Sequence, residues 1–132
     1  MKHLISLVFV SLLLIGCQSN EPLSYSDFPH IDHWDDVETM HEATTILYLY
    51  SPTCELCRSI EEPALLHFSE LQAHVAVYLV HAGLIYGQGQ PPVDVESVPT
   101  LIILKNGEFH ELVRGPNHVL DYLVKTLNEF KN

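Results

Sequence analysis

Two cysteines separated by two residues, Cys54 and Cys57, are the side chains in this sequence best suited to chemistry. They follow a strand-like apolar stretch, residues 46–50, and begin a stretch typical of a helix. A cysteine at a helix N-terminus faces unpaired backbone N–H groups and the positive end of the helix dipole, which favour the thiolate. A thiolate attacks disulfides, and a cysteine one turn later can release the mixed disulfide that forms. We therefore expect Cys54 to be a nucleophile and Cys57 its resolving partner.

Strand and helix patterns surround this pair. Residues 44–50 are rich in β-branched and aromatic side chains and nearly free of charge, which predicts a strand covered on both faces. Residues 54–71 then predict a helix, with Thr53 placed to cap it, and residues 74–80 predict a second strand. Before them, apolar residues recur at every third position in 31–42, which predicts an amphipathic helix.

The second half of the chain contains a long connection and a hairpin. Glycines, glutamines and prolines in residues 82–92 predict a loop. Residues 101–104 are apolar, and Asn106 and Gly107 follow as a strong hairpin signal, so residues 109–113 should return as an antiparallel strand. An apolar pattern of helical period closes the chain.

The N-terminus is typical of a targeting segment and not of a fold. A short cationic start precedes a stretch of twelve residues, 4–15, that is almost wholly apolar and too short to span a bilayer, which takes about 20 residues as a helix. Residues 14–17 resemble the lipobox of bacterial lipoproteins, which implies that Cys17 is lipidated and becomes a membrane anchor. We expect a signal peptide over 1–16, a tether over 17–30 and one domain over 31–132. The alternative is an ordinary cleaved signal with an incidental cysteine.

Composition narrows the class of protein. The chain has 132 residues, which allows one small domain after the targeting segment. Asp and Glu number 17 against 6 for Lys and Arg, a formal charge of −11, so nucleic acid is not an expected partner. With Cys17 consumed by lipid, only two thiols remain, and a four-cysteine zinc site is excluded.

Three local motifs resemble the thioredoxin family, and the resemblance covers residues 31–130. They are the C-x-x-C sequence 54–57 after an apolar strand, the segment Ser97-Val98-Pro99-Thr100 about forty residues later, and the hairpin 104–108. The resemblance implies an α/β fold, a thioredoxin-like three-layer sandwich with a mixed central sheet and helices on both faces.

The resemblance also implies roles for single residues. Cys54 is the exposed nucleophile, Cys57 the more buried resolving thiol and Pro99 a cis-proline beside them, with Val98 and Thr53 next to a bound substrate. It implies a monomeric thiol-disulfide oxidoreductase acting on protein disulfides or dithiols outside the cytoplasm. No dissociable cofactor and no metal are implied. The resemblance does imply an electron partner, an unidentified protein of the membrane or of the space outside the cytoplasm.

The sequence departs from the family around the cysteines. The family usually has a tryptophan at the position of Thr53 and Gly-Pro between the cysteines, where this chain has Glu55 and Leu56. Tyr48 stands where the family has a buried carboxylate. The negative charge of Glu55 disfavours the Cys54 thiolate and makes the disulfide less oxidising, which favours a reductant or isomerase over a strong oxidase.

Two other functions fit the sequence. Cys54, Cys57 and a histidine such as His81 could bind copper or zinc, which dialysis of the reduced protein against these metals would reveal. A non-catalytic adaptor could use residues 82–92 for docking and keep the cysteines as a static disulfide. Reduction of insulin by the soluble domain would separate an adaptor from an enzyme.

Overall fold

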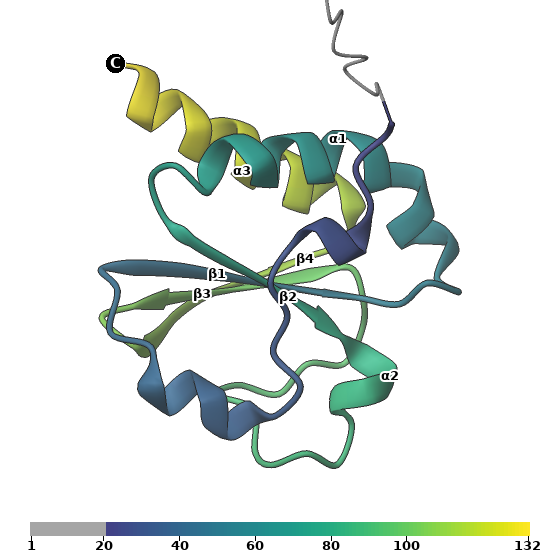
Figure 1. Ribbon diagram of the computed structural model, residues 1–132, viewed down its shortest axis with the longest axis vertical. Helices are drawn as coiled ribbons and strands as arrows, with labels where there is room; N and C mark the ends of the chain where they lie inside the picture. The colour runs from purple at the N-terminus through teal and green to yellow at the C-terminus, as the bar shows by residue number, and fades with distance from the viewer. Residues whose placement is uncertain (1–20) are drawn as a thin grey trace, which may run out of the picture.

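The computed structural model describes residues 21–132, which form three layers around a central sheet (Figure 1). The expected signal peptide and Cys17 lie outside the described residues. Within 21–132, no helix has both the length and the apolar composition that crossing a membrane requires.

The sheet has four strands in the order β2-β1-β3-β4. The strands are β1 (Thr44–Tyr50), β2 (Ala76–His81), β3 (Thr100–Lys105) and β4 (Glu108–Arg114). β1 pairs with β2 in parallel and with β3 antiparallel, and β3 pairs with β4 antiparallel. The mixed sheet and the α/β fold class predicted from the sequence are therefore confirmed.

Helices cover both faces of the sheet. The long helices α1 (Glu55–Leu71) and α3 (Pro116–Lys131) lie on one face, and the 3₁₀ helix η2 (Trp34–Thr39) and the short helix α2 (Ala82–Ile85) lie on the other (Figure 1). Successive side chains of a strand point to opposite faces, so β1 contributes to two cores. Its residue Tyr48 packs under α1, whereas Leu47 and Leu49 pack with η2 and α2.

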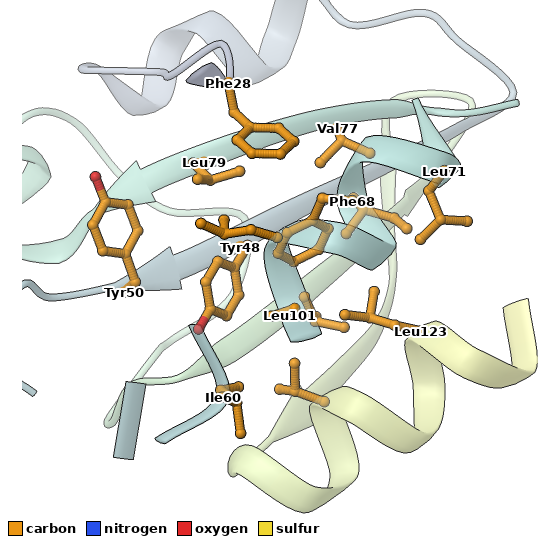
Figure 2. Close-up of a cluster of buried hydrophobic side chains, with 14 of the residues drawn as sticks. Phe28, Tyr48, Tyr50, Ile60, Phe68, Leu71, Val77, Leu79, Leu101 and Leu123 are labelled. Carbon is orange, nitrogen blue, oxygen red and sulfur yellow. The ribbon is translucent and has the colours of Figure 1, made fainter. Parts of the chain in front are cut away.

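The core beneath α1 and α3 is aromatic near β1. Figure 2 shows Tyr48 beside Phe68, and their ring centroids lie 5.0 Å apart. Phe28 meets Phe68 edge-on at 6.2 Å, from the opposite side. The rings fix α1 against β1, and α1 carries the cysteines at its first turn.

The helix predicted over 31–42 is shorter than expected and is of the 3₁₀ type, η2. Its apolar positions are spaced by three residues, and a 3₁₀ helix has three residues per turn. That period places Trp34 and Val37 on one face, where both are buried, together with Ile31 and Met40 at its ends. The predicted amphipathic helix is therefore present, but the spacing of its apolar residues corresponds to a 3₁₀ helix and not to an α-helix.

The hairpin between β3 and β4 forms at the two residues predicted to turn. Asn106 and Gly107 have φ values of 53° and 82°, as a two-residue hairpin turn requires. The turn is also anchored, because the N–H of Asn106 donates to the carbonyl of Ala43 at 3.2 Å. A Cβ on Gly107 would collide with the carbonyl oxygen of Met40, so space as well as φ requires glycine there.

The folded unit begins earlier than the expected boundary at residue 31. The N–H of Ile31 donates to the carbonyl of Leu79, at 3.1 Å, and the N–H of Leu79 donates to the carbonyl of Pro29, at 2.8 Å. Phe28 is buried, and Tyr25, in the 3₁₀ helix η1 (Tyr25–Asp27), packs against the same core. The second half of the expected tether therefore lies against β2.

Candidate active site

Cys54 lies where the carboxyl end of β1 turns into α1. The turn is closed by the N–H of Cys54, which donates to the carbonyl of Ser51 at 3.1 Å. The helix begins at Glu55, so Cys54 is its N-cap. The expectation that Thr53 caps this helix is wrong, because the helix starts one residue later and the Thr53 hydroxyl pairs instead with that of Ser51 at 3.1 Å.

The Cys54 sulfur is held by two backbone groups. The N–H of Cys57 donates to Cys54 Sγ at 3.1 Å, and the thiol of Cys54 donates to the carbonyl of Val98, with 3.7 Å between sulfur and oxygen. A donor aimed at the sulfur, together with the helix N-terminus, stabilises negative charge there. Cys54 is partly exposed, so a sulfur with this stabilisation is also accessible.

Cys57 is fully buried one turn into α1, and both thiols are free in this structure. Burial, together with the hydrogen bond to Cys54, raises the pKa of the Cys57 thiol to about 12. Cys57 therefore keeps its proton near neutral pH. Of the two, Cys54 is the sulfur that can meet a visiting molecule.

Pro99 directly follows Val98, whose carbonyl contacts the Cys54 sulfur, and the Val98–Pro99 peptide bond is cis. The carbonyl of Pro99 accepts a hydrogen bond from the N–H of Gly115, at 3.0 Å, which ties this segment to the start of α3. Cys54, Cys57, Val98 and Pro99 are thus brought together by the fold. Thr53 is exposed beside them.

Tyr48 occupies the core beneath the cysteines. Its side chain is fully buried, and its hydroxyl has no hydrogen-bond partner among residues 21–132. Burial raises its pKa well above the ordinary range, and the charges of Tyr25 and Cys57 act in the same direction. Tyr48 is therefore a neutral neighbour of the thiols and not an anionic one.

Two aromatic residues beside this site, Tyr25 and Tyr50, were not among the site residues predicted from the sequence. Their rings stack at 3.8 Å with 16° between the planes, and the buried hydroxyl of Tyr25 has no partner within the described residues. Desolvation, followed by the charges of Glu61 and Cys57, raises the Tyr25 pKa. Tyr25 lies in a polar stretch that was predicted to be a tether, so the sequence around it gave no signal that Tyr25 is partly buried.

Tyr50 is fixed by His30. The Tyr50 hydroxyl and His30 Nε2 are 2.7 Å apart, and His30 Nδ1 lies 2.9 Å from the carbonyl oxygen of Phe28. A carbonyl only accepts, so Nδ1–H donates to it, and in the neutral ring Nε2 accepts from the tyrosine. This pair attaches the N-terminal segment to the end of β1, directly before the cysteine turn.

His81, the histidine considered as a third metal ligand, has a structural role. Its Nδ1 accepts from the N–H groups of Gly83 and Leu84, at 3.1 and 3.2 Å, and so caps α2. Across residues 21–132, no three His, Cys, Asp or Glu side chains are grouped so that they could hold a metal ion.

Comparisons with known proteins identify the fold. No protein-family model and no curated protein sequence matches the chain. Among solved structures, the chain is similar to mitochondrial thioredoxin 3 of Saccharomyces cerevisiae, with a TM-score of 0.65 and 15% identity over 81% of this chain and 99% of that one. It is also similar to thioredoxin from Trypanosoma brucei brucei, with a TM-score of 0.62 and 21% identity over 85% of this chain and 98% of that one.

A third similar structure is the thioredoxin of Malassezia sympodialis, with a TM-score of 0.61 and 18% identity over 77% of this chain and 89% of that one. The protein therefore has the thioredoxin fold. The expected three-layer arrangement is confirmed, with the C-x-x-C pair at the carboxyl end of β1.

Proposed function

We propose that the protein is a thiol-disulfide oxidoreductase that uses Cys54 and Cys57 on protein substrates. The observation that carries this proposal is the pair of contacts at the Cys54 sulfur, one with the N–H of Cys57 and one with the carbonyl of Val98. The first stabilises the thiolate, and the second places the sulfur beside backbone that an extended client chain can approach.

The reaction has two exchange steps. In the first, the Cys54 thiolate attacks one sulfur of a client disulfide, the client S–S bond breaks, and the other client sulfur leaves as a thiolate that takes a proton. A disulfide now joins Cys54 to the client. In the second step Cys57 loses its proton and its sulfur attacks Cys54 Sγ. The bond between Cys54 and the client breaks, and the second client sulfur leaves as a thiolate that takes up a proton. Two electrons and two protons have moved to the client, and a Cys54–Cys57 disulfide remains.

Reduction or isomerisation of disulfides fits this site better than strong oxidation. Glu55 is exposed at the first position of α1, next to the nucleophile, where its charge partly offsets the stabilisation that the Cys57 N–H gives the thiolate. A less stable thiolate makes the dithiol a better electron donor. The reduction potential of a protein lacking residues 1–17 tests this direction, and a value near that of strong oxidants, about −120 mV, would contradict it.

The place of action is part of the same proposal. We infer from the motif at residues 14–17 that Cys17 carries lipid and holds the domain on the outer side of a cell membrane, where disulfides persist. Reducing equivalents would come from a membrane or extracytoplasmic thiol carrier. Incorporation of labelled fatty acid into the full chain, compared with Cys17→Ala, tests the anchor.

Insulin reduction tests the activity. The soluble domain with dithiothreitol should precipitate reduced insulin faster than dithiothreitol alone, and Cys54→Ser should abolish the difference. Ser69→Ala, an exposed position far along α1, is the matched control and should behave as wild type. Equal rates for wild type and Cys54→Ser would contradict the proposal.

A second experiment traps the intermediate. Cys57→Ser keeps the nucleophile but removes the resolving sulfur, so the mixed disulfide between Cys54 and a client peptide should accumulate. Mass spectrometry under non-reducing conditions measures this adduct. An adduct that forms equally well with Cys54→Ser would show that Cys54 is not the attacking sulfur.

A further inference from the structure

A groove of about 680 Å³ lies on the face of the sheet that η2 and α2 cover. Trp34 and Leu49 contribute to its apolar lining, Ile85 and Tyr86 line it from the end of α2, and residues 94–98 line it from the segment before β3. In Figure 1 this segment and α2 lie below the sheet, on the side opposite α1 and α3.

The walls of the groove are held by backbone hydrogen bonds. The N–H of Trp34 donates to the carbonyl of Gln88, and the N–H of Gln88 donates to the carbonyl of Ile85, each at 2.9 Å. The side chains of Trp34 and Ile85 are buried in the core beneath. The groove is therefore formed before any ligand arrives, so little ordering is needed on binding.

The groove adjoins the candidate active site through Val98. Val98 lines it, and the carbonyl of the same residue contacts Cys54 Sγ. A client cysteine bonded to Cys54 must lie next to Val98, so the chain that flanks this cysteine can continue directly into the groove.

The charged residues that line the groove are all acidic. Asp94 and Glu96 are exposed on its lining, and none of the five Lys and Arg residues between 21 and 132 lines it. Tyr86, a residue that is 87% exposed, adds an apolar surface beside them. A cleft lined by one sign of charge attracts ligands of the opposite sign.

We propose that this groove selects client proteins in which lysine or arginine flanks the disulfide, with apolar residues between. The inference rests on the proposed exchange activity and adds a substrate class to it. Glu96 and Asp94 precede Val98 by two and four residues, so extended backbone places them within about 7 and 14 Å of it. The basic residues of the client therefore lie within about four positions of its cysteine.

Matched peptide disulfides test the selection. Two short peptides each carry one disulfide, and the residues that flank each cysteine are apolar. The peptides differ only at the second and fourth positions before and after each cysteine, where one peptide has Lys and the other has Glu. Each is mixed with the reduced soluble domain, and the second-order rate of Cys54–Cys57 oxidation is measured. We expect the Lys peptide to react about fivefold faster than the Glu peptide at low ionic strength, with the ratio falling toward one in 1 M salt.

A charge-matched pair of variants separates the groove from the overall acidity of the protein. Asp94→Asn with Glu96→Gln removes two negative charges from the groove. Glu42→Gln with Glu108→Gln removes two exposed charges near the paired residues Thr44 and Lys105, at the end of the sheet opposite the cysteines. The first variant should lose most of the preference for the Lys peptide, and the second should keep it.

The outcomes are distinct. Equal ratios in the two double variants would overturn the proposal, because the preference would then come from net charge alone. No preference in the wild type would overturn it as well. If the wild type oxidises with neither peptide although dithiothreitol reduces both, the exchange activity itself fails, and the groove proposal fails with it.

Discussion

The backbone N–H of Cys57 donates a hydrogen bond to the Sγ of Cys54 at 3.1 Å, which makes the proposed nucleophile the N-cap of α1. The sulfur to which we assign the proposed exchange chemistry thus also accepts a hydrogen bond that stabilises the start of the helix. Loss of an N-cap side chain costs about 1 kcal/mol, whereas a serine hydroxyl can accept the same hydrogen bond.

The two roles of Cys54 are separable by substitution. Cys54→Ala should lower the free energy of unfolding by about 1 kcal/mol relative to Cys54→Ser, because only serine retains an acceptor for the Cys57 N–H. Both variants should be inactive. Urea unfolding of the two proteins under reducing conditions measures the difference, and equal midpoints would show that an acceptor atom at position 54 contributes nothing as a cap.

Burial of Cys57 makes stability depend on alkaline pH. An unfolded cysteine has a pKa of about 8.5, while the native Cys57 thiol has a pKa of about 12, so between these values the native state binds more protons. This contribution to stability is complete below pH 8.5 and is lost as the pH rises toward 12. Reduced wild type should therefore lose about 1 kcal/mol more than Cys57→Ala between pH 7.5 and 9.5.

Urea unfolding at the two pH values measures this loss in both proteins. The range ends below the titration of the tyrosines, whose native pKa values are raised as well at Tyr25 and Tyr48. The oxidised wild type, which has no Cys57 thiol, is the second control. Parallel losses in all three proteins would contradict the assignment to Cys57.

Tyr48 and Tyr50 lie on the same face of β1 but should respond oppositely to loss of the hydroxyl. Tyr48→Phe removes a buried hydroxyl without a partner in the described residues and should raise the free energy of unfolding, by about 1 kcal/mol. Tyr50→Phe breaks the hydrogen bond with His30 Nε2 and should lower it by a similar amount. Urea unfolding of each variant against wild type measures both effects, and a loss of stability in Tyr48→Phe would show that its hydroxyl has a partner.

Alanine substitutions at two glycines with positive φ, Gly87 and Gly107, distinguish the cost of backbone strain from the cost of a steric collision. Gly107 (φ 82°) lies against the carbonyl oxygen of Met40, whereas Gly87 (φ 78°) has open space where a Cβ would stand. Gly87→Ala should cost about 1 kcal/mol from conformation alone, and Gly107→Ala should cost clearly more. Denaturant midpoints of the two variants give the comparison, and equal losses would mean that Met40 moves aside freely.

Local patterns predicted most of the elements correctly. The strand 44–50, the turn at Asn106 and Gly107, and the helix that starts at the C-x-x-C pair were all visible in the sequence. Each depends on the properties of near neighbours, which the sequence displays directly. Where the prediction differed, at η2, the four apolar residues are spaced strictly by three, which fits a period of 3.0, whereas a period of 3.6 would spread them over about half of the helix circumference.

The sequence alone thus determined that two thiols one helical turn apart stand at a helix start, because neighbours along the chain set both the turn and the spacing. Only the tertiary structure decided what surrounds them. Val98 reaches Cys54 from 44 residues away, and Tyr25 stacks on Tyr50 from a stretch with no burial pattern. Such contacts follow from how the sheet orders its strands and closes its cores, and no local property of either partner specifies the other.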